Sequence, residues 1–298
     1  MCSTKSMSVS PGHQSRLLAT LLACSICWQI SQSEPLDAAD LQYPVAVAVA
    51  PSGTIYVADR KLPGIWQLEA GKLEVFITGE KKIGGFLNAV RCLAIDAKGQ
   101  LLVGDSATRE VYRIDQEKKS TPLTARGIGI PMDIAVTAQG DLFVSDLELH
   151  CVWKVAKTGG KPTKVAALAG ASGVTLDDKQ NLWVVSRAQK PLQKLLLDGK
   201  LETVVAKRLF QFPNDVIVDK TGTAYVTDSY QKCIWKVAPE QAPESWVSGG
   251  SLQNPVGISW LGEDLIVVDS RARDVFKISA DGKTITSLTG KEATLDKE

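Results

Sequence analysis

The stretch FPNDVIVDKTGTAYVTDS, which runs from Phe212 to Ser229, decides the fold of this chain. It opens with Pro-Asn-Asp, continues as a short valine-rich run, turns at Lys-Thr-Gly and ends a second run with Asp228. Two β-rich runs joined by a glycine-containing turn predict a β-hairpin. The same pattern returns five times elsewhere in the chain, so the stretch is one copy of a repeated unit.

The other copies keep the order of Pro, alternating apolar residues, Gly and a closing Asp. They are YPVAVAVAPSGTIYVADR from Tyr43, AVRCLAIDAKGQLLVGDS from Ala89, IPMDIAVTAQGDLFVSDL from Ile130, GASGVTLDDKQNLWVVSR from Gly170 and NPVGISWLGEDLIVVDS from Asn254. The closing residues are Asp59, Asp105, Asp146, Ser186, Asp228 and Asp269, at successive spacings of 46, 41, 40, 42 and 41 residues. The fourth copy departs most from the pattern, which indicates either drift in one unit or a specialised site.

Each unit continues with a third run and a weaker fourth run, and no amphipathic helix lies between them. Seven residues after the closing position stand Trp66, Tyr112, Trp153, Gln193, Trp235 and Phe276. Because an aromatic residue recurs at one position, we expect it to pack between neighbouring units. The repeat therefore predicts an all-β fold, a six-bladed β-propeller with four antiparallel strands per blade over residues 43–290.

The phase of the repeats predicts how the ring closes. The first copy begins with its own inner strand, and the sixth completes its outer strand with Thr284 to Leu288. No strand need be borrowed from the N-terminus, so we expect closure by side-chain packing between blades 1 and 6.

The repeated pattern resembles NHL-repeat six-bladed β-propellers and is similar to the wider superfamily of senescence-marker-protein and gluconolactonase-like propellers. The resemblance covers Tyr43 to about Thr289 and rests on six copies of the motif. It implies the fold, whereas activity stays open because this scaffold hosts unrelated chemistries and binding roles.

Composition bounds the class of protein. The chain has 298 residues, of which 44% are hydrophobic, and a formal net charge of +1. These values indicate a globular protein with no bulk attraction to nucleic acid or to an anionic membrane.

The N-terminus predicts export. Arg16 precedes an apolar run from Leu17 to Trp28 that is too short to span a bilayer, so we expect a secretory signal over residues 1–33 and a leader over residues 34–42. Residues 291–298 form a charged tail. The protein is thus expected to be secreted or periplasmic, monomeric and without a membrane span, although Leu-Leu-Ala-Cys ending at Cys24 resembles a lipobox and leaves lipid anchoring as an alternative.

Cleavage of the signal would leave Cys92, Cys151 and Cys233, an odd number that argues against a disulfide framework. His150 is the histidine that remains, and no CxxC pair accompanies it, so a zinc site is poorly supported. We expect the three thiols to be buried as small hydrophobic groups.

Candidate site residues follow from the differences between copies. The repeated closing Asp is predicted to fix the turn by accepting backbone N–H groups. The two positions after the Pro, at the start of each inner strand, vary, and their polar members gather in blades 2 to 5. They give the candidate binding residues Arg91, Asp133, Ser172, Asn214 and Asp215.

The loops at the same end of the predicted blades are rich in basic residues. They carry Arg60, Lys61, Lys81, Lys82, Arg109, Arg126, Arg187, Lys190, Lys207, Arg208, Lys232, Arg271 and Arg273. Such a face would attract an anionic ligand or partner surface, with Arg187 and Arg271 as candidate contacts, although solvated charges that keep loops soluble are the alternative.

The resemblance also implies a candidate enzymatic activity, the hydrolysis of lactones. Lactonases of that superfamily hydrolyse sugar lactones with one divalent cation held by a Glu, two Asn and an Asp at inner-strand entrances, and oxygen ligands suit Ca²⁺. Carried over by position, Asn214 matches, while Asp133 and Asp215 stand one place later, where strand alternation points them away from the channel unless they act from its mouth. The Glu has no counterpart near Tyr43, and Arg91 opposes a cation.

Two hypotheses remain. The first is a non-enzymatic module without a cofactor that binds an unknown protein or small-molecule ligand, and not nucleic acid. The second is a divergent metal-dependent hydrolase with Asn214, Asp133 and Asp215 as metal ligands. Zinc lyases on this repeat need several histidines and a Ser-His-Asp hydrolase needs a nucleophile motif, which the chain lacks.

Overall fold

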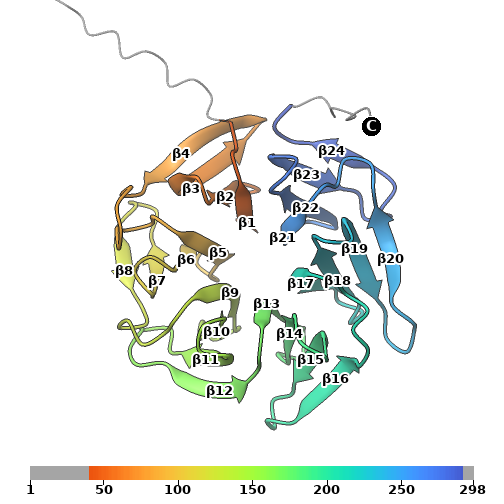
Figure 1. Cartoon of the computed structure of the whole chain (residues 1–298). Coiled ribbons are helices and arrows are strands. Elements are labelled where there is room, and N and C mark those ends of the chain that lie inside the picture. Colours follow the sequence, from red (N-terminus) through yellow and green to blue (C-terminus); the bar gives the residue numbers. More distant parts are fainter. Residues whose placement is uncertain (1–39, 291–298) are drawn as a thin grey trace, which may run out of the picture. The chain divides into compact units, whose positions relative to one another are not determined.

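The computed structural model of this protein describes residues 40–290 as six four-stranded antiparallel sheets set around a central axis (Figure 1). The prediction of an all-β six-bladed propeller is therefore confirmed. Among residues 40–290 there is no helix long and apolar enough to cross a membrane. The predicted signal with Cys24, most of the leader and the tail lie outside the described residues.

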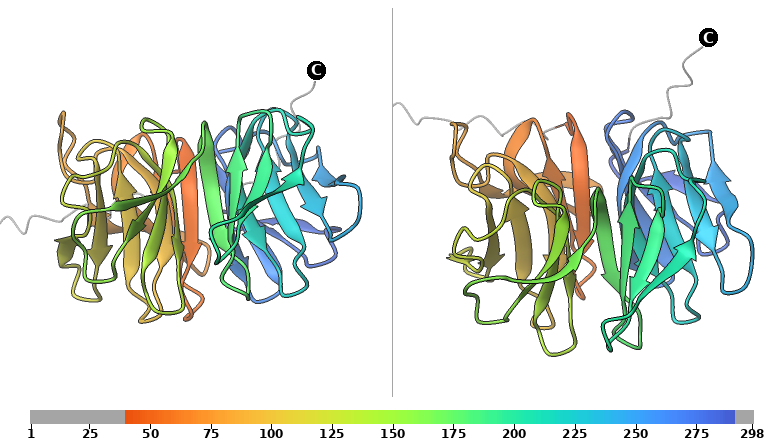
Figure 2. Two further views of the ribbon diagram at one scale, coloured as in Figure 1. Left: turned by 90° about the horizontal axis from the view of Figure 1, so that it is seen from below. Right: turned by 60° about the horizontal axis from the view of Figure 1, so that its bottom comes forward.

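Each blade is a simple meander whose first strand lies innermost (Figures 1 and 2). Blades 1 to 3 comprise β1 Pro44–Val49, β2 Ile55–Asp59, β3 Leu62–Glu69, β4 Lys72–Thr78, β5 Val90–Ile95, β6 Leu101–Asp105, β7 Glu110–Ile114, β8 Ser120–Pro122, β9 Pro131–Val136, β10 Leu142–Asp146, β11 Cys151–Val155 and β12 Thr163–Ala167. Blades 4 to 6 comprise β13 Ala171–Leu176, β14 Leu182–Ser186, β15 Leu192–Leu195, β16 Leu201–Val205, β17 Pro213–Val218, β18 Ala224–Asp228, β19 Cys233–Val237, β20 Glu244–Ser248, β21 Pro255–Leu261, β22 Asp264–Asp269, β23 Asp274–Ile278 and β24 Ile285–Ser287.

The repeated Asp at the end of each second strand fixes two loops at once. In blade 5, Asp228 accepts the backbone N–H groups of Gln211 and Phe212 before the inner strand, and those of Tyr230 and Gln231 in the following turn. Asp59, Asp105, Asp146 and Asp269 bond in the same way. The predicted turn-fixing role is confirmed.

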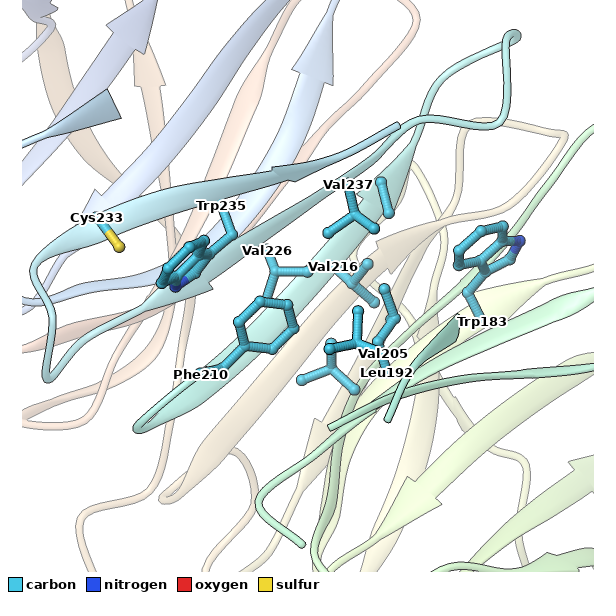
Figure 3. Close-up of a cluster of buried hydrophobic side chains, with 11 residues drawn as sticks. Trp183, Leu192, Val205, Phe210, Val216, Val226, Cys233, Trp235 and Val237 are labelled. Carbon is cyan, nitrogen blue, oxygen red and sulfur yellow. The ribbon is translucent and has the colours of Figure 1, made fainter. Parts of the chain in front are cut away.

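The core consists of apolar clusters, each shared by two neighbouring blades. Figure 3 shows the cluster between blades 4 and 5, where Trp235 and Phe210 lie beside Leu192 and Val205. Trp66, Tyr112, Trp153 and Phe276 belong to corresponding clusters, so the predicted packing role of the aromatic position is confirmed. A further repeated position, three residues before each inner strand, is a buried apolar residue in every blade: Leu41, Leu87, Ile128, Leu168, Phe210 and Leu252.

The ring closes as the repeat phase predicts. The four strands of every blade come from one continuous segment, so no strand is shared between the chain ends. One cluster joins Val47 and Trp66 of blade 1 to Val268 and Val275 of blade 6, and Leu41 completes it.

Replacing Leu41 with alanine is expected to lower the free energy of unfolding by about 2 kcal/mol, because a buried leucine truncated to alanine leaves a cavity. Leu168→Ala at the equivalent place between blades 3 and 4 is the matched control. Chemical denaturation should give similar losses for both variants. A negligible loss for Leu41→Ala alone would contradict closure by packing.

Cys92, Cys151 and Cys233 are unpaired and buried, which confirms the prediction for the thiols.

Candidate functional site

The inner strands leave two cavities on the axis, one at each end. The first, of about 320 Å³, is lined by the starts of the inner strands and by the loops around them, and we call it the arginine cavity after Arg60, Arg91 and Arg187. The second, of about 340 Å³, is lined by the ends of the inner strands, and we call it the far cavity. Asp133 and Asp215 line both, so they stand at the waist between them.

The orientation expected for Asp133 and Asp215 from strand alternation is wrong. Each inner strand carries a register shift at its start, which in blade 5 falls between Pro213 and Val216. Such a bulge breaks the two-residue period of side-chain directions. As a result, Asn214 and Asp215 both line the arginine cavity.

Asp133 and Asp215 influence each other electrostatically, and each is hydrogen-bonded to a neighbouring inner strand. Asp133 of blade 3 accepts the N–H of Val174 in blade 4 at 2.7 Å, and Asp215 of blade 5 accepts that of Ile258 in blade 6 at 3.0 Å. Gly173 makes room for this arrangement, because a Cβ there would lie 2.5 Å from the Cα of Asp215. Each carboxyl group therefore ties the inner strand of its own blade to the inner strand of the next blade.

Burial and mutual proximity favour the protonated form of these acids. Burial, followed by the charge of Asp215, raises the pKa of Asp133 well above its usual range. Burial raises the pKa of Asp215 to about 6, although backbone N–H groups of Ile258 and Val216 oppose the shift. Two buried carboxyl groups that repel each other when charged cannot easily both ionise, so the pair favours holding a proton near neutral pH.

The arginine cavity concentrates positive charge. Burial and the like charge of Arg60 lower the pKa of Arg91, and burial and the charge of Arg91 lower that of Arg187. The charge of Arg91 is therefore close enough to be felt by Arg187, and that of Arg60 by Arg91. Among residues 40–290 none of the three forms an ion pair with a carboxylate.

Arg187 is held in place by its neighbours. Its guanidinium lies 3.9 Å from the ring centroid of Phe212, and its Nη2 donates to Oδ1 of Asn214 at 3.0 Å. Asn214 is fixed in turn, because its Nδ2 donates to the carbonyls of Phe212 and Pro255. A guanidinium fixed by stacking and hydrogen bonding is pre-organised to bind an anion.

The other sequence candidates are placed differently. Arg91 lines the arginine cavity, and its Nε donates to Ser106 Oγ. Ser172 is buried and bonds the carbonyls of Val185 and Pro213, so it joins strands and lines neither cavity. Arg271 is exposed in the loop between β22 and β23, outside the cavity lining.

Several lining residues were missed as site candidates although a positional signal exists for them. The residue before the Pro of the repeat contributes Tyr43, Phe212 and Asn254 to the lining. The residue after the closing position contributes Leu147 and Ser229, beside Arg60 and the candidate Arg187, which the basic loops had already indicated. Both positions differ from copy to copy, so a comparison of the copies at these places would have found them.

The donor set does not fit the divalent cation that the resemblance implies. Oδ1 of Asn214 already accepts from the Arg187 guanidinium, and the carboxylates of Asp133 and Asp215 already accept backbone N–H groups. Arg60, Arg91 and Arg187 line the same cavity, and their charge opposes a hard cation.

Comparisons with known proteins show which sequences and folds this chain resembles. No protein-family model matches the chain. A stretch of 65 residues is 37% identical to the E3 ubiquitin-protein ligase TRIM32 of Mus musculus and 35% identical to that of Homo sapiens. This stretch covers 21% of the chain and 10% of either ligase, so the chain spans a small part of those relatives.

Solved structures match over most of the chain. A virginiamycin B lyase from Staphylococcus aureus has a TM-score of 0.63 at 13% identity and covers 84% of this chain and 86% of its own. A gluconolactonase from Xanthomonas campestris has a TM-score of 0.66 at 14% identity, with 80% and 86% covered. The nidogen/laminin complex gives 0.65 at 16%, with 82% and 91% covered. The resemblance to this group of six-bladed propellers is thereby confirmed, and identities this low establish the fold alone.

Proposed function

We propose that this protein is a non-enzymatic recognition propeller that binds an anionic group in the arginine cavity. The observation that carries the proposal is the convergence of Arg60, Arg91 and Arg187 on one recess without an ion-paired carboxylate among residues 40–290. Three like charges held together are unfavourable in the free protein, and a bound anion relieves that repulsion.

The shape of the recess supports the same proposal. Arg187 is fixed by Phe212 and Asn214, so little side-chain entropy is lost when an anion binds. Tyr43, Ser229 and Asn254 add polar groups to the lining. A carboxylate or phosphate would therefore find charged donors together with orienting hydrogen-bond partners.

A metal-dependent lactone hydrolase is the alternative raised by the sequence. Likeness of fold to gluconolactonases supports it, whereas the donors around Asn214 oppose a cation. Export also belongs to the proposal, since the apolar run after Arg16 supports a signal; attaching residues 1–33 to a reporter enzyme would test secretion.

Arg91→Gln and Arg187→Gln are each expected to weaken binding of citrate or inorganic phosphate at least tenfold. A hydrogen bond to a charged group contributes about 1.5–3 kcal/mol, which is the corresponding range. Isothermal titration calorimetry of the full chain measures the effect, and Arg271→Gln is the control, because Arg271 lies on the same face outside the cavity.

Equal affinity in all three variants would contradict binding in the arginine cavity. Calcium binding together with lactone hydrolysis that Asn214→Ala abolishes would replace the recognition proposal with the hydrolase.

A further inference from the structure

Charge is divided unequally between the two faces of the propeller. We define the basic face as the loops that precede each inner strand and the loops that join second to third strands. Within residues 40–290 these loops hold the thirteen Lys and Arg residues from Arg60 to Arg273 named above, against three acids, Asp40, Glu80 and Glu148. Glu80 and Glu148 already pair with Lys82 and Arg109. The loops of the basic face therefore carry an excess of positive charge, which the buried closing Asp of the second strands at the same end offset in part.

The opposite face, formed by the remaining loops, is nearly balanced. Its described loops hold eleven Asp and Glu residues and nine Lys residues. The described residues are close to neutral because acids within the strands, among them the five closing Asp, offset the excess of basic residues in these loops. A charge difference of this kind between two ends of a disc steers an anionic partner to one of them.

Apolar side chains stand exposed among these basic loops. Ile83 is fully exposed, Tyr230 is 76% exposed, and Leu149 and Phe212 are each 43% exposed. All four belong to loops of the basic face, and Phe212 also lines the arginine cavity. Large apolar groups left in water beside a charged recess are typical of protein contact surfaces.

We propose that the basic face docks an acidic segment of a partner protein, with one acidic side chain in the arginine cavity and apolar side chains against Leu149, Phe212 and Tyr230. The inference rests on the proposed function, because it assigns the source of the anion. A cavity of about 320 Å³ admits a side chain and not a folded domain, so the surrounding loops carry the remaining contacts.

The observations favour a polypeptide over other polyanions. Nucleic acid stacks its bases on aromatic groups, whereas two of the four exposed apolar residues, Ile83 and Leu149, are aliphatic. A bilayer presents a flat layer of headgroups, whereas the most concentrated charge lies recessed on the axis between the starts of the inner strands. An acidic peptide supplies both an acid that reaches inward and apolar groups that remain on the face.

Selection from a randomised peptide-display library on the immobilised full chain tests the inference. We expect the enriched peptides to combine Asp or Glu with aliphatic or aromatic residues. A synthetic copy of an enriched peptide should bind at least tenfold more weakly to the Lys207→Glu/Arg208→Glu variant and to Arg91→Gln. The matched control is Lys118→Glu/Lys119→Glu, an adjacent pair on the opposite face, which should leave affinity unchanged.

The apolar contribution is measured separately. Leu149→Ser and Tyr230→Ser are each expected to weaken the peptide at least threefold while leaving phosphate affinity at Arg91 unchanged. Peptides enriched without acids, or an equal loss in the Lys118/Lys119 control, would overturn the inference.

Two further probes test whether other polyanions, lipid vesicles or single-stranded RNA, bind the basic face instead. Tighter binding of vesicles of phosphatidylserine and phosphatidylcholine, or of single-stranded poly(U), that depends on Lys207 and Arg208 would overturn the peptide assignment. Phosphate binding at Arg91 without selection of acidic peptides would end this inference and leave the proposed function standing, whereas peptide binding that ignores Arg91→Gln would end the proposed function.

Discussion

Replacing Asp146 with alanine is expected to lower the free energy of unfolding by about 4 kcal/mol, the largest effect of a single substitution considered for this protein. The carboxylate is fully buried and accepts five donors: the N–H groups of Gly129, Ile130, Glu148 and Leu149, and Nε1 of Trp153. Alanine leaves these donors without an acceptor, and each unsatisfied buried polar group costs about 1–3 kcal/mol before water enters. Equilibrium denaturation by urea measures the loss.

Blade 4 offers the control for this prediction. Ser186 stands at the equivalent position, donates to the carbonyl of Lys190 and accepts the N–H of Ala188. Ser186→Ala should cost about 1 kcal/mol, since fewer bonds depend on it. Similar losses for the two variants would show that the repeated Asp does not organise its loops as described.

The second large effect concerns pH. The pKa of Asp215 is raised from 3.8 to about 6, so the folded protein binds a proton that the unfolded chain releases near pH 4. Stability from this group is fully present below about pH 4 and is lost as pH rises through about 6. One pKa unit corresponds to about 1.4 kcal/mol, so the free energy of unfolding should fall by roughly 3 kcal/mol over this window.

Asp215→Asn is expected to reduce the decline in denaturation curves measured between pH 4 and pH 7, and the part due to Asp133, whose pKa is also raised, should remain. Asp177→Asn is the control of opposite sign: burial works to raise the pKa of Asp177, but hydrogen bonds from Trp183 and Asn181 prevail and lower it. Its stabilising contribution is fully present above about pH 4 and is lost only as pH falls below that value, so this variant should leave the decline between pH 4 and pH 7 nearly unchanged. An unchanged decline in Asp215→Asn would contradict the waist arrangement of the two acids.

The fold could be predicted almost entirely from the sequence, because the same physical requirements recur in six copies. The closing Asp fixes a loop, the glycine turn joins two strands and the aromatic of the third strand packs between blades. Every blade needs these three functions, so their repetition along the sequence indicates their structural roles. Even blade 4 keeps its four strands, although Ser186 and Gln193 replace the usual Asp and aromatic.

The candidate site could be predicted in part. Arg91, Asn214 and the two aspartates were found because they break the repeat. Their orientations were not, because a bulge at the start of each inner strand depends on pairing with the second strand and has no local sequence marker. The contact of Arg187 with Phe212 joins residues 25 positions apart through a loop geometry that the strand pattern does not specify.

The continuity of each blade has a consequence for biosynthesis. Because all four strands of a blade come from one segment, strand pairing within a blade does not wait for the far end of the chain, whereas each core cluster needs the neighbouring blade as well. The contacts between Leu41, Val268 and Val275 join the first blade to the last, so they form only when synthesis of the sixth blade is complete. Until then, the apolar side of blade 1 that later meets blade 6 stays uncovered and is open to aggregation.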